Sequence, residues 1–265
     1  MMTDPIRFTV DQGLARITLN RPQRLNAFNS NLAHAWVEAT REATSRDDVG
    51  AILIDAEGRA FCAGGDVIEM AQSMSSGSDI TALADVINKG IRALTESKIP
   101  VVAAAHGTTA GGGLGILLCS DYAVVGSDSK LGSRYANVGL TPDLSVSAQL
   151  ARAVGERRAL QLVLQDRMLS AYEAESWGLV AEVVDQGESS DIASAVRFRA
   201  EEIAHSWLRG AFRAYGQAKH LIRSQPSRTF VEQLTAEAAS IGTFFDTDDA
   251  KARVGAFAAA STARG

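Results

Sequence analysis

The sequence predicts an α/β protein with a helical C-terminal region. Two short apolar runs, at 51–54 and 99–105, have the length and the Val, Ile and Ala content of buried strands. Each run leads into a glycine turn and then into a segment with helical patterning. From Asp191 onward no strand pattern appears, and the remaining segments read as helices. Alternating strands and helices followed by helices alone indicate an α/β core with a helical addition.

Composition narrows the class of protein. The 265 residues are 46% hydrophobic and 22% charged, which is ordinary for a globular protein. A net charge of −5 argues against a general nucleic-acid-binding surface. No apolar run approaches the eighteen residues of a membrane span, and the first residues lack a signal-peptide pattern. We therefore expect a cytoplasmic protein without nucleic-acid or membrane partners, with Cys62 and Cys119 as buried free thiols.

The elements before residue 98 begin with a hairpin. In chain order, we expect strands at 6–10 and 14–19, a helix from Ser30 to about Thr44, the strand 51–54, a short helix at 66–71, and a longer helix that Asp79 caps. The polar run 73–78 predicts a mobile loop between the last two helices.

The elements after the central glycine turn alternate before the helical tail begins. We expect strands at 122–125, 130–132 and 180–184, a loop at 133–143, and helices at 144–153, 156–165, 170–177, 191–206, 209–224, 227–245 and 247–260. Several tail helices have wide apolar faces, which either fold back on the core or pack against another subunit.

Two glycine turns follow the buried strands. The first is Phe61–Asp66, and the second contains Gly111, Gly112 and Gly113. The second turn has neither the spacing of a dinucleotide fingerprint nor the Gly-Lys-Ser/Thr of a phosphate-binding P-loop. One interpretation is tight packing between helix and sheet. The other is that two strand-end turns aim two backbone N–H groups at one oxygen, which is an oxyanion hole.

Four motifs carry a resemblance to a known family. They are RPQRLNAFN at 21–29, AFCAGGDVIEM at 60–70, KIPVVAAAHGTTAGGGLG at 98–115 and EAESWGLVAEVVD at 173–185. In order and spacing they resemble the crotonase (enoyl-CoA hydratase/isomerase) superfamily, over nearly the whole chain.

The resemblance implies a fold and an assembly. It implies a crotonase-like spiral of β-β-α units over residues 1–200, which binds a coenzyme A thioester. It assigns residues 201–265 to a C-terminal helical region that builds a homotrimer, often a dimer of trimers. Coenzyme A then enters as part of an acyl-CoA substrate, and neither a prosthetic group nor a metal is expected.

The resemblance also assigns residues to the site. The backbone N–H groups of Gly65 and Gly112 would form the oxyanion hole. The residues implied to bind coenzyme A are Arg24, Leu25, Ala27, Ala63, Gly65, Asp66 and Val67. Taken alone, Arg24 reads as part of a solvated loop; by resemblance it contacts the phosphates.

The two glutamates of the hydratases are missing. Gly115 stands where the first would be, and the register Gly132-Ser133-Arg134-Tyr135 places Tyr135 at the second. A glycine inside a helix costs about 1 kcal/mol relative to alanine, so we expect Gly115 to leave room for a ligand.

Asp143 is the remaining acid near the predicted site. It lies where branches resembling 1,2-epoxyphenylacetyl-CoA isomerase and 4-chlorobenzoyl-CoA dehalogenase place their working aspartate. The dehalogenase histidine is matched by Asn88, and its tryptophan by Tyr135, which makes Tyr135 a candidate catalytic residue. On sequence alone, Asp143 could instead cap a helix beginning near Leu144.

Three functions follow from these residues. The first is double-bond isomerisation of an enoyl-CoA, with Asp143 moving one proton between two carbons. The second is another reaction of the superfamily, either hydratase-like or aryl-CoA substitution with Asp143 as nucleophile. The third is acyl-CoA binding without catalysis. No histidine has metal-ligand spacing, and no G-x-S-x-G elbow predicts a serine hydrolase.

Overall fold

A six-stranded sheet forms the centre of the protein. The computed structural model describes residues 4–262. The sheet has the order β1-β2-β3-β4-β6-β9, in which β1 is antiparallel to β2 and the other neighbours are parallel. Its strands are β1 (Ile6–Asp11), β2 (Leu14–Leu19), β3 (Ala51–Ala56), β4 (Val101–Ala105), β6 (Tyr122–Gly126) and β9 (Glu182–Val184). The predicted hairpin and the buried strands are confirmed.

A second, three-stranded sheet was predicted only in part. It has the order β5-β7-β8, with strands Thr108–Ala110, Lys130–Gly132 and Met168–Ser170. Of these, only β7 was expected from the sequence. Strands of three residues are too short to show an alternating pattern, so the sequence alone predicts a turn over β5 and the start of a helix at the end of β8.

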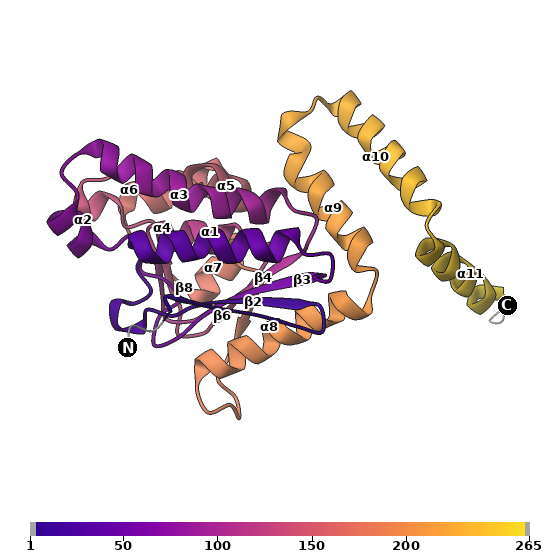
Figure 1. Cartoon of the computed structure of the whole chain (residues 1–265), viewed down its shortest axis with the longest axis horizontal. Helices are drawn as coiled ribbons and strands as arrows, with labels where there is room; N and C mark the ends of the chain where they lie inside the picture. The colour runs from indigo at the N-terminus through magenta and orange to yellow at the C-terminus, as the bar shows by residue number, and fades with distance from the viewer. Residues whose placement is uncertain (1–3, 263–265) are drawn as a thin grey trace.

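Helices cover both faces of the larger sheet (Figure 1). They are α1 (Ser30–Ser45), α2 (Val67–Ser73), α3 (Gly77–Glu96), α4 (Gly112–Leu118), α5 (Val146–Val154), α6 (Glu156–Gln165), α7 (Ala171–Trp177), α8 (Ile192–Arg209), α9 (Phe212–Ser224), α10 (Phe230–Phe245) and α11 (Asp248–Thr262). In Figure 1, α1 and α3 lie on one side of the sheet and α8 on the other.

The central strands are apolar throughout because both of their faces are buried. In β3, Ile52 and Ile54 face the larger core beneath α1 and α3, whereas Ala51 and Leu53 face the core that α8 covers. The same alternation divides β4 between the two cores. Rigid parallel strands therefore carry the two glycine turns, which follow the carboxyl ends of β3 and β4.

Two predicted helix caps were wrong by a few residues. The N-cap of α1 is Asn29, whose side chain accepts a hydrogen bond from Leu32 N at 2.9 Å, and Ser30 is the first helical residue. The N-cap of α3 is Ser76, and Asp79 completes its capping box from the third helical position. The predicted loop at 73–78 shortens to Met74–Ser76, because α2 and α3 extend into it.

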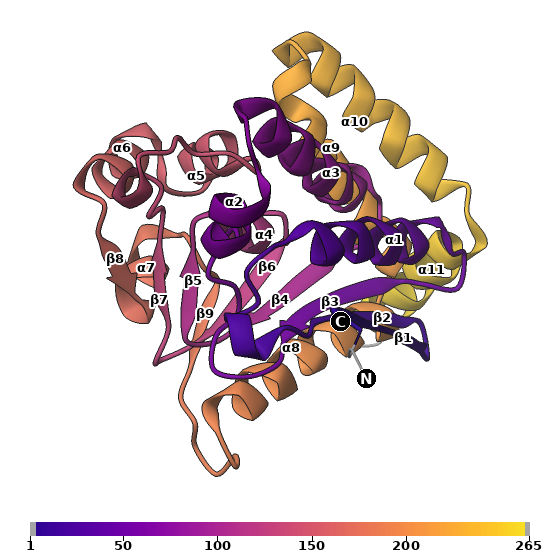
Figure 2. The ribbon, with the colours of Figure 1, turned by 60° about the vertical axis from the view of Figure 1, so that its left-hand side comes forward.

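The C-terminal helices leave the body of the protein. Helix α9 packs against α8 and α3, while α10 and α11 run along and beyond it (Figures 1 and 2). Residue 200, the predicted boundary of the C-terminal region, falls inside α8. Large apolar side chains on the outer helices stay exposed: Phe230, Val231, Ile241, Phe245 and Phe257.

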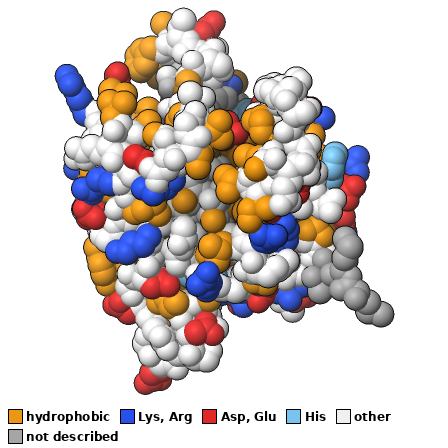
Figure 3. All heavy atoms as spheres, turned by 90° about the vertical axis from the view of Figure 1, so that its left-hand side faces the viewer, with side chains coloured by type: hydrophobic (Ala, Val, Ile, Leu, Met, Phe, Trp, Pro, Cys, Tyr) orange, Lys and Arg blue, Asp and Glu red, His pale blue; other side chains and the backbone are white. Residues whose placement is uncertain are grey.

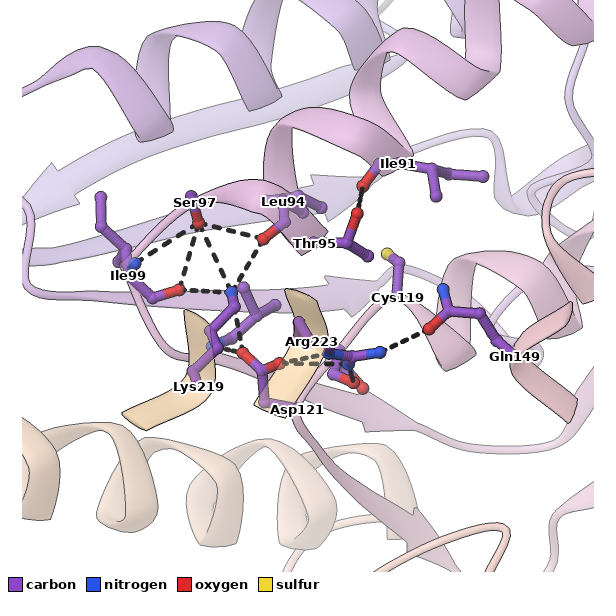
Figure 4. Close-up of polar contacts among 12 residues, drawn as sticks. Ile91, Leu94, Thr95, Ser97, Ile99, Cys119, Asp121, Gln149, Lys219 and Arg223 are labelled. Atoms are coloured by element: carbon purple, nitrogen blue, oxygen red, sulfur yellow. Dashed lines mark hydrogen bonds and ion pairs between the residues drawn. The ribbon is translucent and has the colours of Figure 1, made fainter. Parts of the chain in front are cut away.

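A buried ion pair attaches α9 to the core. Lys219, only 7% exposed, donates to Asp121 at 2.9 Å and to the carbonyl oxygens of Leu94 and Ile99 (Figure 4). Arg223 lies on the other side of the same carboxylate. The ammonium of Lys219 and the guanidinium of Arg223 both contact Asp121, just after the C-terminus of α4. The negative end of that helix dipole also favours positive charge there.

The remaining expectations for the fold concern thiols and membrane spans. Cys62 and Cys119 are free and buried, as predicted, and burial raises the pKa of each thiol to about 12. Within residues 4–262, none of the helices is both long and apolar enough to cross a membrane.

Candidate active site

A cleft of about 730 Å³ opens beside the two glycine turns. Its walls come from segments within 23–28, 59–70, 80–87, 111–112 and 134–144. Every residue that the sequence analysis assigned to the site borders this cleft, namely Arg24, Leu25, Ala27, Ala63, Gly65, Asp66, Val67, Gly112, Tyr135 and Asp143. On the face shown in Figure 3, hydrophobic side chains gather centrally and Lys and Arg side chains lie around them.

Backbone pairing between loops builds the first glycine turn. Phe28 N donates to Gly64 O at 2.7 Å, and Asp66 N donates to Phe28 O at 2.9 Å. This bridge uses the peptide groups on both sides of Gly65, so the N–H of Gly65 points away from Phe28. Cys62 pairs in turn with Thr108 and Ala110, which joins the first turn to the second.

The two turns touch each other. Gly64 has a φ of +107°, and a Cβ atom there would lie 3.3 Å from Gly112 N. Gly112 is the first residue of α4, so its N–H has no acceptor within the helix. Among residues 4–262, neither Gly65 N nor Gly112 N donates to a backbone or side-chain acceptor. Two free N–H groups therefore border the cleft from adjacent turns.

Asp143 and Tyr135 form a hydrogen-bonded pair in the wall of the cleft. The Tyr135 hydroxyl donates to Asp143 Oδ1 at 2.5 Å. Burial raises the pKa of Asp143 above its ordinary value, and this hydrogen bond offsets only part of the rise. Burial and the adjacent carboxylate raise the pKa of Tyr135 far above the usual range, so the phenol stays neutral and donates. The alternative interpretation, in which Asp143 caps a helix, is wrong: α5 begins at Val146, with Ser145 as its N-cap.

A strained turn presents Asp143. Val146 N donates to Asp143 O at 2.9 Å, and both central residues, Leu144 (φ 46°) and Ser145 (φ 64°), are left-handed. A turn with positive φ at both positions normally carries Asn or Gly, so Leu and Ser hold this shape against strain.

The same turn fills the space beside Gly115. A Cβ atom at position 115 would lie 2.2 Å from Leu144 O, and one at Gly112 would lie 2.7 Å from Leu144 Cδ1. The expectation that Gly115 makes room for a ligand is wrong, because the backbone of Leu144 occupies that space. A glutamate at position 115 could not fit without moving the turn that holds Asp143.

Charged groups gather at the predicted coenzyme A end of the cleft. Asp66 accepts from Arg21 at 3.1 Å and from the amide of Glu69 at 3.3 Å. Burial tends to raise the pKa of Asp66, but these two hydrogen bonds and the nearby charges of Arg21 and Arg24 together outweigh it, and the pKa is lowered. Arg24 is exposed and has no ion-pair partner within the described chain.

Sequence reasoning missed two further cations that border the cleft, Arg59 and Arg134. Arg134 pairs with the backbone and carboxylate of Asp166. Arg59 precedes the AFCAGGD motif by one residue, and that neighbourhood was the one available signal for it.

Part of the wall of the cleft is apolar. It consists of side chains from α2 and α3, namely Met70, Ile80, Leu83, Ala84 and Ile87. The four from α3 have helical spacing, which aligns them along one face of that helix. Asp85 on α3 is exposed at the border of this wall.

Histidines and metal ligands take no part in the cleft. His106 is buried, and its Nε2 lies 2.7 Å from Gly58 O, outside the residues that border the cleft. Within residues 4–262, no cluster of His, Cys, Asp or Glu is arranged to hold a metal ion.

Comparison with known proteins identifies relatives of this chain. The family described as enoyl-CoA hydratase/isomerase matches residues 9–262. A trans-2-decenoyl-[acyl-carrier-protein] isomerase of Streptococcus mutans is 31% identical over 82% of this chain and 81% of its own. A probable enoyl-CoA hydratase of Mycobacterium leprae is 32% identical over 97% of this chain and 96% of its own.

Solved structures agree with these sequence relatives. A putative enoyl-CoA hydratase/isomerase from Mycobacterium abscessus superposes with a TM-score of 0.86 at 30% identity, and the match covers 96% of each chain. The predicted spiral α/β fold with a helical C-terminal region is therefore confirmed. The chain belongs to the enoyl-CoA hydratase/isomerase (crotonase) family, and it is an enzyme that acts on coenzyme A thioesters.

Proposed function

We propose that the protein isomerises the double bond of an enoyl-CoA, with Asp143 as the single base. The observation that carries this proposal is the pairing of Asp143 with Tyr135 in the cleft, combined with the filled space at Gly115. One carboxylate can both remove and return a proton, which is all that a double-bond shift requires.

The geometry supports a mechanism with one intermediate. The thioester carbonyl oxygen accepts hydrogen bonds from Gly65 N–H and Gly112 N–H, which stabilise negative charge as it develops. Asp143 removes a proton from C2 of a 3-enoyl thioester, and the electron pair of that C–H bond moves into the carbonyl group, which gives a dienolate with its charge on the oxygen. When the carbonyl re-forms, a double bond forms between C2 and C3 and the electron pair of the 3,4 double bond takes up a proton at C4. The protonated Asp143 then returns the proton to C4, and the product is the 2-enoyl thioester. Atoms and charge balance without another reactant.

Hydration is less well supported because it normally uses two carboxylates that share one water. Among the described residues, three carboxylates border the cleft: Asp66, Asp85 and Asp143. Asp66 is paired with Arg21 and caps α2, and Asp85 lies exposed on α3. Asp143 is then the only one of the three that is partly buried and has no cationic partner among the described residues.

The walls of the cleft also suggest how the substrate lies. We assign the coenzyme A portion to Arg24, Leu25, Ala27, Ala63, Asp66 and Val67, and the acyl chain to the apolar wall of α2 and α3. The name of the Streptococcus relative, a decenoyl isomerase, supports an aliphatic acyl group. Coenzyme A is then substrate rather than a resident cofactor.

The exposed helices support a proposal about assembly. Phe230, Ile241 and Phe245 on α10 are more than half exposed, and a surface of this kind on a soluble chain marks an interface. We propose a homotrimer or a dimer of trimers built through residues 201–265, with residues 1–200 as the substrate-binding core.

A substrate panel tests the proposed reaction. The enzyme is incubated separately with 2-enoyl-, 3-enoyl- and halobenzoyl-CoA thioesters, and each product is examined by mass spectrometry and ultraviolet absorption. Isomerisation leaves the mass unchanged and creates a conjugated thioester from the 3-enoyl substrate. Addition of water would indicate hydration, loss of halide would indicate substitution, and binding without any product would indicate a non-catalytic protein.

A further inference from the structure

A chain of hydrogen bonds runs from helix α9 to the turn that presents Asp143. Arg223 on α9 donates from Nε to Asp121 at 3.1 Å and from Nη2 to Ser120 O at 2.5 Å. Its remaining terminal nitrogen, Nη1, donates to the side-chain oxygen of Gln149 on α5. Figure 4 shows Arg223 between Asp121 and Gln149.

Gln149 continues the chain toward the site. Its Nε2 donates to Ser145 Oγ at 3.1 Å, and Ser145 is the left-handed N-cap of α5. The amide orientation is fixed, because the guanidinium has only donors and must face the Gln149 oxygen. Gln149 is 7% exposed, so this arrangement is built into the interior rather than formed at the surface.

The strain in the turn explains why such support is needed. Leu144 and Ser145 both have positive φ without the Gly or Asn that would relieve it. Residues held in such conformations persist only when their surroundings determine them. The backbone bond from Val146 N to Asp143 O closes the turn from one side, and the Gln149 bond to Ser145 Oγ holds it from the other.

We propose that Arg223 and Gln149 are positioning residues for the reaction, holding the Asp143 turn in its productive shape through Ser145. This inference rests on the proposed role of Asp143 as base. It makes the contact of Arg223, in the C-terminal region, with Gln149 a condition for the productive shape of the site in the core. Neither side chain borders the cleft, so we expect neither to contribute to substrate affinity.

Two substitutions at position 149 separate positioning from packing. Gln149→Leu keeps the volume but removes both hydrogen bonds. Gln149→Glu keeps both, because a carboxylate accepts from Arg223 and from the Ser145 hydroxyl. We expect Gln149→Leu to lower kcat about 10- to 100-fold with KM unchanged, since small misplacements of a reacting group have effects of that size. Gln149→Glu should restore most of kcat.

Lys219→Met is the matched control for α9. Lys219 shares Asp121 with Arg223 but has no contact with Gln149. Lys219→Met should lower the melting temperature and leave the kcat of the folded enzyme unchanged. If kcat instead falls in Gln149→Leu and Lys219→Met alike, in proportion to their melting temperatures, the role is structural and the proposal is wrong. Wild-type kcat in Gln149→Leu would also overturn it, as would failure of Gln149→Glu to restore activity.

Hydrogen–deuterium exchange gives a readout that does not depend on the reaction. The amide of Val146 closes the Asp143 turn, so its exchange should accelerate about tenfold or more in Gln149→Leu and stay near wild type in Gln149→Glu and Lys219→Met. Unchanged exchange in Gln149→Leu would contradict the proposal. If wild-type enzyme isomerises no enoyl-CoA, the proposed function fails by itself, and the exchange result still decides whether the chain holds the turn.

Discussion

The carbonyl oxygen of Leu144 lies where a side chain at Gly115 would have to begin. A Cβ atom at position 115 would be 2.2 Å from that oxygen, so the pair links the sequence of α4 to the shape of the turn before α5. Because Asp143 precedes Leu144, the absence of one carboxylate and the placement of the other have a common structural cause.

Gly115→Ala should therefore disturb the turn and the activity together. We expect the added methyl group to cost about 1–3 kcal/mol of unfolding free energy, as overpacking of a core does, and to lower kcat. Gly242→Ala is the control: Gly242 is also helical, in α10, but a Cβ atom there meets nothing within 4 Å. Chemical denaturation and steady-state kinetics measure both variants. Equal stability of Gly115→Ala and wild type would show that Leu144 can move away from the added methyl group at little energetic cost, and would contradict this prediction.

Asp143→Asn should be at least as stable as wild type at neutral pH. Burial raises the pKa of Asp143, so the ionised carboxylate is less stable in the folded than in the unfolded protein. The stability that this group contributes is present below its unfolded pKa and is lost as pH rises through the raised folded value. Asparagine removes this dependence and still accepts from Tyr135. The advantage of the variant in melting temperature should shrink as pH falls toward about 4. A variant that melts lower at pH 7 would contradict this explanation.

Arg24→Ala should weaken binding of coenzyme A thioesters. Arg24 borders the cleft and is free of ion pairs within the described chain, so its charge is available to a phosphate. We expect the dissociation constant to rise about tenfold at low salt, and less at high salt because an exposed contact is screened. Arg92→Ala, on the exposed side of α3, is the control. Isothermal titration with unchanged affinity for both variants would remove Arg24 from the site.

The apolar face of α10 should hold the assembly together. Ile241 and Phe245 are 73% and 57% exposed, so replacing both with Lys should reduce a trimer to monomers without unfolding the core. Leu164→Lys, at an equally exposed position on α6, should leave the assembly intact. Light scattering measures the mass of each. A double variant that remains trimeric would place the interface elsewhere.

The sequence predicted the parts of the fold that have long periodic patterns. The β1–β2 hairpin, the apolar strands β3 and β4, and the helices after Asp191 all follow from periodicity and burial. The three-residue strands β5 and β8 could not be predicted, because pairing partners distant in the chain define them.

The sequence predicted which residues belong to the site but not how they are arranged in space. The motifs gave the residues that border the cleft, because each motif belongs to a loop at a strand end. The role of Asp143 could not be settled from the sequence. An aspartate just before a predicted helix resembles a cap, and only the tertiary structure brings the Tyr135 hydroxyl to 2.5 Å from its carboxylate. The series of hydrogen bonds from Arg223 to Ser145 joins residues 78 positions apart, and no local sequence pattern predicts it.

Transfer of a labelled proton tests the central claim most directly. A 3-enoyl-CoA carrying deuterium at C2 is converted in ordinary water under single-turnover conditions, and the position of the label in the product is determined by mass spectrometry. If Asp143 moves the proton, part of the deuterium should appear at C4 of the 2-enoyl product. Asp143→Asn should lower the rate by about 10²–10⁴-fold while the protein remains folded. Undiminished transfer by folded Asp143→Asn would contradict the account.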